Sequence, residues 1–146
     1  MFDKLNAAPV IRTVGDKIYS FTMLKRKHLA ELLSKWIAED YRDLKQRLKD
    51  SGFDKKEIFE RLEKFHEETK MSGPLYGHKS LYQLNRTFET VLMSLQLTDP
   101  KITDDDLDGL PFVYTELLVI AGELWGLKFD DTKTEKEEKK DENPTK

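Results

Sequence analysis

The spacing of the apolar residues changes near residue 25, and this change constrains the fold more than any other feature. Before it, Val10–Val14 and Lys17–Phe21 are rich in β-branched and aromatic residues and flank Gly15-Asp16, a pair typical of the two-residue turn of a β-hairpin. After it, apolar residues recur with a helical period, which predicts a long amphipathic helix that ends at Ser51-Gly52. The stripe consists of Leu29, Leu32, Leu33, Trp36, Ile37, Tyr41, Leu44 and Leu48.

A second helix is predicted to begin after residue 53. Asp54 is a suitable N-cap, and Glu57 stands at the position where it can complete a capping box with that residue. The expected buried face consists of Ile58, Leu62, Phe65 and Thr69. Residues 71–79 then contain Gly73-Pro74 and Gly77, and these residues predict a loop.

Two more helices are predicted in the second half of the chain. Ser80 is a candidate cap for the first, which should run to about Gln96. Its apolar face consists of Leu81, Leu84, Phe88, Val91, Leu92 and Leu95. Thr103 is expected to cap a short acidic turn. Pro111 suits the first position of the last helix, which should end near Trp125 and is the most apolar segment of the chain.

These elements predict a mainly α protein, with an N-terminal β-hairpin packed on a bundle of four to five helices. An isolated hairpin is barely stable in water, so we expect it to dock on helices. A chain of 146 residues is long enough for one hydrophobic core, and we assign residues 1–129 to a single domain. Residues 130–146 are highly charged and lack large apolar residues, which predicts a disordered tail.

Composition excludes several classes of function. The chain has no cysteine, so disulfides, thiolate metal sites and a cysteine nucleophile are ruled out. Charges of both signs are interspersed and the pI is near 5.7, which argues against nucleic-acid binding. The N-terminal segment does not match a signal peptide, and no apolar run is long enough for a membrane helix, so we expect no membrane association.

Residues 104–116, DDDLDGLPFVYTE, begin like the calcium-binding loop of an EF-hand. That loop requires a bidentate Glu at its twelfth position, where this chain has Thr115, and Glu116 comes one residue late. Pro111 occupies a position that would need a backbone N–H. We therefore expect Asp104, Asp105 and Asp106 to form the first turn of a helix, where the helix dipole favours carboxylates.

The remaining polar clusters do not indicate catalysis. Glu63 and His66 form one E-x-x-H pair, whereas di-iron bundles use two such pairs with further Glu ligands. The cationic stretch Lys25–Lys27 is interpreted as a solvated helix entrance. The chain lacks a glycine-rich phosphate loop and a recognisable nucleophile motif. We therefore expect a protein that is not an enzyme and that uses no metal and no cofactor.

Large aromatic residues are more numerous than a small helical core usually hides. An apolar groove that accepts a partner helix or strand is a common use of such a surplus. We therefore expect protein binding, through residues on the apolar helix faces. The predicted contact residues are Trp36, Phe112, Tyr114, Leu118 and Trp125.

Two segments resemble the tail assembly chaperones of long-tailed bacteriophages. VGDKIYSFTMLKRKHLAELLSKW is similar to the hairpin and first helix of that family, and FETVLMSLQLTDPKITDDDLDGLPFVYTELLVIAGEL is similar to its later helix, acidic turn and last helix. The resemblance covers roughly residues 8–127, and the Gly-Pro segment at 72–77 departs from it. It implies a host-cytoplasmic protein that holds the tape measure protein, recruits tail tube subunits and uses no nucleotide. Self-association stays open.

Other assignments remain as alternatives to the chaperone. The chain could instead be another phage or bacterial structural or adaptor protein, such as a head-tail connector subunit. It could also be an acidic inhibitor that presents its negative surface to a basic partner. Each alternative is a protein-binding role.

Overall fold

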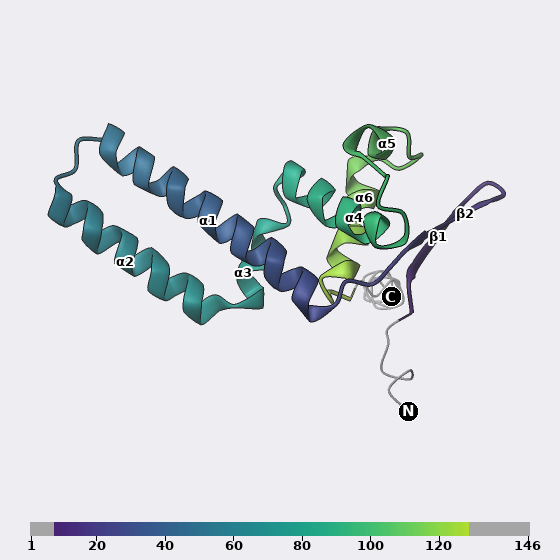
Figure 1. Cartoon of the computed structure of the whole chain (residues 1–146), viewed down its shortest axis with the longest axis horizontal. Coiled ribbons are helices and arrows are strands. Elements are labelled where there is room, and N and C mark those ends of the chain that lie inside the picture. The colour runs from purple at the N-terminus through teal and green to yellow at the C-terminus, as the bar shows by residue number, and fades with distance from the viewer. Residues whose placement is uncertain (1–7, 129–146) are drawn as a thin grey trace, which may run out of the picture.

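The computed structural model describes residues 8–128, which form a two-stranded sheet and six helices (Figure 1). The elements are β1 (Val10–Val14), β2 (Lys17–Phe21), α1 (Arg26–Asp50), α2 (Lys55–Ser72), α3 (Pro74–Ser80), α4 (Leu84–Thr98), α5 (Asp104–Asp108) and α6 (Tyr114–Leu124). The predicted mainly helical fold with an N-terminal hairpin is confirmed. The predicted tail, residues 130–146, lies outside the described residues.

The hairpin has the predicted strand limits and turn. Val10 pairs with Phe21 and Val14 pairs with Lys17, so Gly15 and Asp16 alone make the turn. Gly15 has a φ of 61°, a conformation that suits glycine. Side chains alternate between the faces of a strand, and one face buries Val10 and Phe21 against the helices. Ile18 lies on the other face and is 70% exposed.

Helices α1 and α2 pack antiparallel against each other and form an arm that projects from the rest of the molecule (Figure 1). After α1 the chain turns at Gly52, whose φ is 80°. The N–H groups of Gly52 and Phe53 donate hydrogen bonds to the carbonyl oxygens of Lys49 and Leu48, respectively. Helix α2 then begins at the predicted cap, because Asp54 Oδ1 accepts a hydrogen bond of 2.8 Å from the Glu57 N–H. Local sequence thus determines the turn at the tip of the arm.

The predicted loop at residues 71–79 is wrong, because residues 74–80 form helix α3. Pro74 stands at the start of α3, where its missing N–H costs nothing. Gly77 lies inside α3 directly under the Trp125 ring, and a Cβ on Gly77 would come within 2.4 Å of that ring. The glycine that suggested a loop is therefore needed for close packing of a helix.

Two predicted helix starts are also wrong. Ser80 ends α3 instead of capping the next helix, and α4 begins at Leu84. The last helix begins at Tyr114 instead of Pro111, because the Glu116 carboxylate accepts a hydrogen bond of 3.1 Å from the Val113 N–H. This capping bond defines the start of α6 three residues later than the proline suggests.

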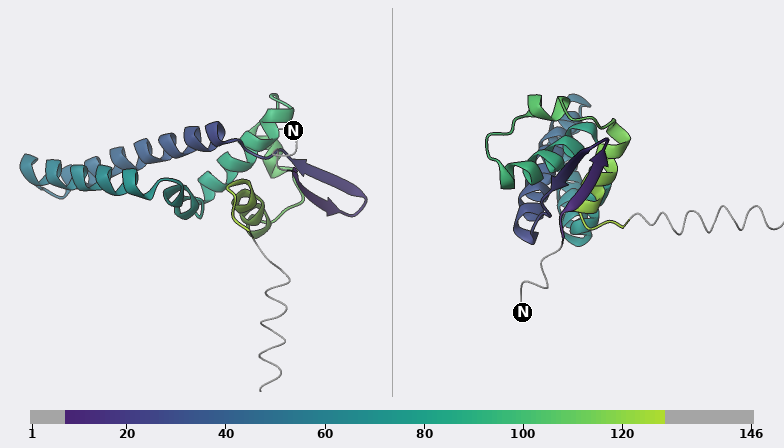
Figure 2. Two further views of the ribbon diagram at one scale, coloured as in Figure 1. Left: turned by 90° about the horizontal axis from the view of Figure 1, so that it is seen from below. Right: turned by 90° about the vertical axis from the view of Figure 1, so that its right-hand side faces the viewer.

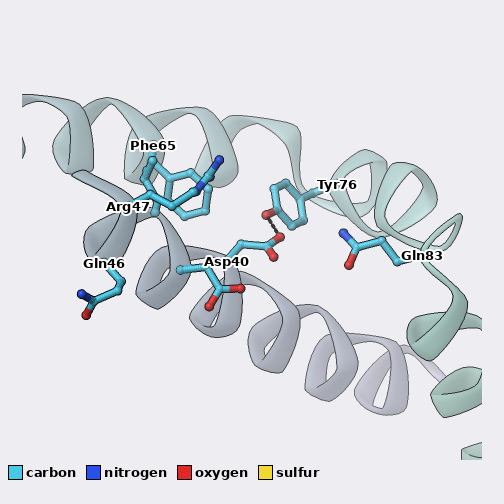
Figure 3. Close-up of a pocket in the computed structure, with 8 residues that line it drawn as sticks. Asp40, Gln46, Arg47, Phe65, Tyr76 and Gln83 are labelled. Atoms are coloured by element: carbon cyan, nitrogen blue, oxygen red, sulfur yellow. Dashed lines mark hydrogen bonds between the residues drawn. The ribbon is translucent and has the colours of Figure 1, made fainter. Parts of the chain in front are cut away.

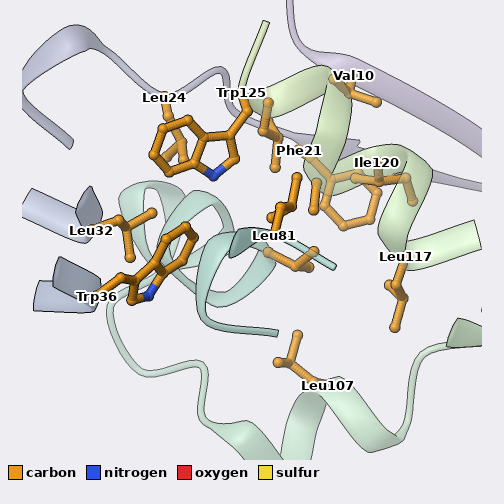
Figure 4. Packing of buried hydrophobic residues seen from close by; sticks show 13 residues of the cluster. Val10, Phe21, Leu24, Leu32, Trp36, Leu81, Leu107, Leu117, Ile120 and Trp125 are labelled. Carbon is orange, nitrogen blue, oxygen red and sulfur yellow. The ribbon is translucent and has the colours of Figure 1, made fainter. Parts of the chain in front are cut away.

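The core lies where α1, α4, α5, α6 and the turn after α3 meet the inner face of the hairpin (Figure 4). The rings of Trp36 and Trp125 pack at 5.3 Å between centroids. Both indole N–H groups have partners at 3.2 Å, Glu89 Oε2 for Trp36 and Thr90 Oγ1 for Trp125. A buried indole N–H usually has a hydrogen-bond partner, and these two bonds help to fix the orientation of both rings.

The molecule is elongated because the arm and the hairpin project from opposite sides of this core (Figures 1 and 2). We call the part made of the hairpin, α3, α4, α5 and α6 the head. Within residues 8–128, no helix is long and apolar enough to cross a membrane.

Candidate functional site

An apolar hollow of about 60 Å³ lies between α3 and α6, and we call it the α3–α6 hollow. It is lined by His78, Leu81, Tyr82, Leu118, Val119, Gly122 and Leu127. Its lining offers few polar atoms, namely those of His78 and Tyr82 among the side chains. An engineered apolar cavity of about 150 Å³ can hold benzene, so the hollow suits one aliphatic side chain better than a ring.

The rim of the hollow carries Tyr82, whose residue surface is 67% exposed. The backbone carbonyl of Tyr82 accepts a hydrogen bond of 2.9 Å from the Tyr114 hydroxyl, which ties the rim to α6. On the opposite side, His78 Nε2 lies 3.0 Å from the Trp125 carbonyl oxygen. Fixed on both sides, the hollow is a preformed site next to an exposed aromatic ring, and this arrangement is typical of protein-binding anchors.

Trp36 and Trp125 were expected to contact a partner, and the structure corrects this expectation. Trp36 is 0% exposed and Trp125 is 4% exposed, so neither ring is accessible on the surface. They pack on each other because α1 and the end of α6 meet at the centre of the core. The two largest side chains of the predicted set therefore hold the fold together.

The other three predicted residues are partly buried and lie around α6. Phe112 packs edge-to-face on Tyr19, with ring centroids 5.3 Å apart, and so holds the hairpin. The Tyr114 hydroxyl donates a hydrogen bond to the Tyr82 carbonyl at the rim of the α3–α6 hollow, and Leu118 lines the hollow. The structure thus brings Tyr114 and Leu118 together at one site and places Phe112 elsewhere.

Sequence reasoning missed Tyr82, which is the most exposed residue of the hollow. Because residues 81–96 were predicted to form one helix, Tyr82 was expected to lie outside the apolar face of that helix. In the structure Tyr82 lies in the turn between α3 and α4, and Leu84, expected in the core, is exposed at the first turn of α4. An exposed tyrosine beside a helix break was the available signal.

The acidic segment forms the helix start that was predicted. Asp104, Asp105 and Asp106 occupy the first turn of α5, and the Thr103 N–H donates a hydrogen bond of 2.8 Å to Asp106 Oδ2. Glu116, the late candidate ligand, caps α6 instead. In the described part of the chain, no three His, Asp or Glu side chains are grouped to hold a metal ion.

A larger cleft of about 680 Å³ lies between the arm and α3 (Figure 3). It is lined by Asp40, Asp43, Leu44, Gln46, Arg47, Phe65, Tyr76 and Gln83. Most of these side chains are polar or charged, and the Tyr76 hydroxyl already donates a hydrogen bond to Asp40 Oδ2. The cleft is wide and polar, whereas the α3–α6 hollow is small and apolar.

Titration of the groups at this cleft reflects their mutual contacts. Desolvation alone would raise the pKa of Asp40, but hydrogen bonds from Arg86 and Tyr76 outweigh it and hold the pKa below its usual 3.8. Desolvation and the bond to Asp40 both raise the pKa of Tyr76. Asp40 is therefore ionised, and Tyr76 protonated, throughout the neutral pH range.

Comparison of the chain with protein-family models, curated proteins and solved structures found no match.

Proposed function

We propose that this protein is a non-enzymatic assembly chaperone that binds another protein through the α3–α6 hollow. The observation that carries the proposal is a small apolar hollow with the exposed Tyr82 ring at its rim. A Leu, Ile, Val or Met side chain of the partner enters the hollow, and Tyr82 covers it. Such contacts concentrate binding energy in a few residues and require no cofactor.

The specific partners follow from the resemblance of residues 8–127 to phage tail assembly chaperones. In this form the protein works in the host cytoplasm, holds the tape measure protein and recruits tail tube subunits. The tape measure protein is long and aggregation-prone, so it offers many apolar segments to a site that takes one side chain. A head-tail connector subunit or an acidic inhibitor remains the alternative, since each is also a protein-binding role.

The test is co-expression with a candidate tape measure protein, followed by affinity measurement with peptides from the bound region. Tyr82→Ala should weaken binding about tenfold or more, the effect of losing an anchor worth about 1.4 kcal/mol or more. Phe59→Ala is the matched control, because Phe59 is an aromatic residue of the arm that is 64% exposed. It should leave the affinity unchanged.

The results of these experiments distinguish binding at the hollow from the assignment of the partner as a tape measure protein. Equal loss of affinity in both variants would contradict binding at the hollow. Failure to capture the tape measure protein would overturn the phage assignment. Circular dichroism of both variants should match the parent chain, since each removes an exposed side chain.

A further inference from the structure

The arm joins the head through a network of charged and polar side chains, which we call the junction network: Asp40 of α1, Tyr76 of α3 and Arg86 of α4. Arg86 Nη2 and Nη1 donate to the two Asp40 oxygens at 2.6 and 3.1 Å. The Tyr76 hydroxyl donates to the same carboxylate (Figure 3). One carboxylate therefore connects three helices.

Arg86 is the most deeply buried member, with 2% of its surface exposed. Its Nη2 also donates to the Trp36 carbonyl at 3.3 Å, and its guanidinium lies 5.4 Å from the centroid of the Trp36 ring. Glu39 is 3.6 Å away, while Nε has no hydrogen-bond partner. Burying this cation is costly, and such pairs often add little net stability compared with apolar residues of the same size.

The part of α1 before Asp40 is fixed in the core by Leu32 and Trp36, and Trp36 donates a hydrogen bond to Glu89 of α4. The part of the arm beyond Asp40 has few contacts with the head. Beyond Asp40, α1 and α2 bury only Leu48, Leu62 and Thr69. Helix α2 contacts chiefly α1 and α3, and it is joined to α3 by Gly73, whose φ is 50°. A two-pronged guanidinium–carboxylate pair is strongly directional, so it can specify the orientation of the helices that it joins.

We propose that the junction network sets the direction of the arm relative to the head, and that apolar residues in place of the whole network would give similar stability. The network acts as a positioning device. Because α3 carries both Tyr76 and the hollow-lining His78, the same helix relates the arm to the α3–α6 hollow. This inference rests on the junction geometry alone and holds whatever partner the hollow binds.

The chain has no cysteine, so two introduced cysteines can be spin-labelled without interference. Lys56→Cys near the tip of α2 and Thr115→Cys on α6 are both exposed positions. Double electron–electron resonance then gives the distribution of distances between arm and head. The test variant combines Asp40→Leu, Tyr76→Phe and Arg86→Met, which replaces the network by apolar side chains of similar size.

We expect the triple variant to unfold cooperatively with a Tm within about 4 °C of the parent chain. Its distance distribution should be at least about twofold broader than that of the parent. Glu123→Gln is the control, because it weakens the ion pair between Glu123 of α6 and Arg12 of the hairpin without touching the junction. It should leave the distribution unchanged.

An unchanged distribution in the triple variant would overturn the proposal, since packing alone would then direct the arm. A large loss of Tm with no broadening would also overturn it, because the network would then be a stabilising element. If the triple variant does not fold, the expected small effect on stability is wrong, and the pair Asp40→Asn and Tyr76→Phe then tests the direction of the arm alone. That pair must also broaden the distribution, and failure to do so contradicts the proposal.

Discussion

At the scale of single residues, the contact between Gly77 and Trp125 explains why a glycine stands inside a helix. A Cβ at Gly77 would lie 2.4 and 2.5 Å from two carbons of the indole ring. Glycine in a helix costs about 1 kcal/mol relative to alanine, and here that cost permits α3 to pack directly on the core. The same contact buries Trp125, which the sequence suggested as a surface residue.

Gly77→Ala should destabilise the protein by about 1–3 kcal/mol, because overpacking outweighs the better helix propensity of alanine. Urea unfolding monitored by circular dichroism measures this change. Gly109→Ala is the matched control. A Cβ there would meet only the Asp106 carbonyl oxygen, at 3.5 Å, so the free energy of unfolding should change little. Equal stability of both variants would contradict the packing.

Trp125→Ala should lower the free energy of unfolding by about 3–5 kcal/mol, the usual result of removing a buried tryptophan. It leaves a cavity next to Trp36 and removes the hydrogen bond to Thr90. The same unfolding assay applies. A variant with unchanged stability and impaired partner binding would instead restore Trp125 as a contact residue.

At the scale of elements, most helices could be predicted from local signals, and α3 could not. The tip of the arm follows from Gly52 and Asp54, which are a helix-ending glycine and a helix-starting cap that need no distant partner. Helix α3 has seven residues and depends on contacts made elsewhere in the chain, with Asp40 and Trp125. Gly-Pro and an internal glycine resemble a loop, and only tertiary packing overrides that preference.

The contacts of Asp40 between elements also predict that the free energy of unfolding depends on pH. The folded state holds the pKa of Asp40 below its usual 3.8, so the ionised carboxylate stabilises the fold above that pH. This stabilisation is lost as the pH falls through the lowered pKa. Asp40→Asn should therefore reduce the free energy of unfolding at pH 7, and the difference from the parent should shrink toward pH 3. Urea unfolding at both pH values measures it, and a difference that grows with acidity would contradict this assignment.

At the scale of the whole molecule, the fold class could be predicted, but the residues of the candidate site could be predicted only in part. Alternation and helical periodicity indicate which residues face inward along each element. They do not indicate which elements meet, so Trp36 and Trp125 were expected outside. Leu118, predicted as a contact residue, lines the hollow, whereas Tyr82 was not predicted because it lies in the turn between α3 and α4.

The candidate site, the α3–α6 hollow, lies on the head of the elongated molecule. The arm and the hairpin extend to opposite sides (Figures 1 and 2). The α3–α6 hollow is lined in part by α3, the helix that contacts α1 of the arm. A partner segment at the hollow would therefore lie close to the arm. The central claim is that the partner is held there and not at another exposed apolar residue.

Site-specific photo-crosslinking in cells tests this claim most directly. A photoreactive phenylalanine replaces Tyr82 in one variant and Phe59 in the other, and both are co-expressed with a tape measure protein as the proposed partner. Binding at the α3–α6 hollow predicts a cross-link from position 82 to an apolar segment of the partner and none from position 59. Cross-linking from position 59 alone, or equally from both positions, would contradict it.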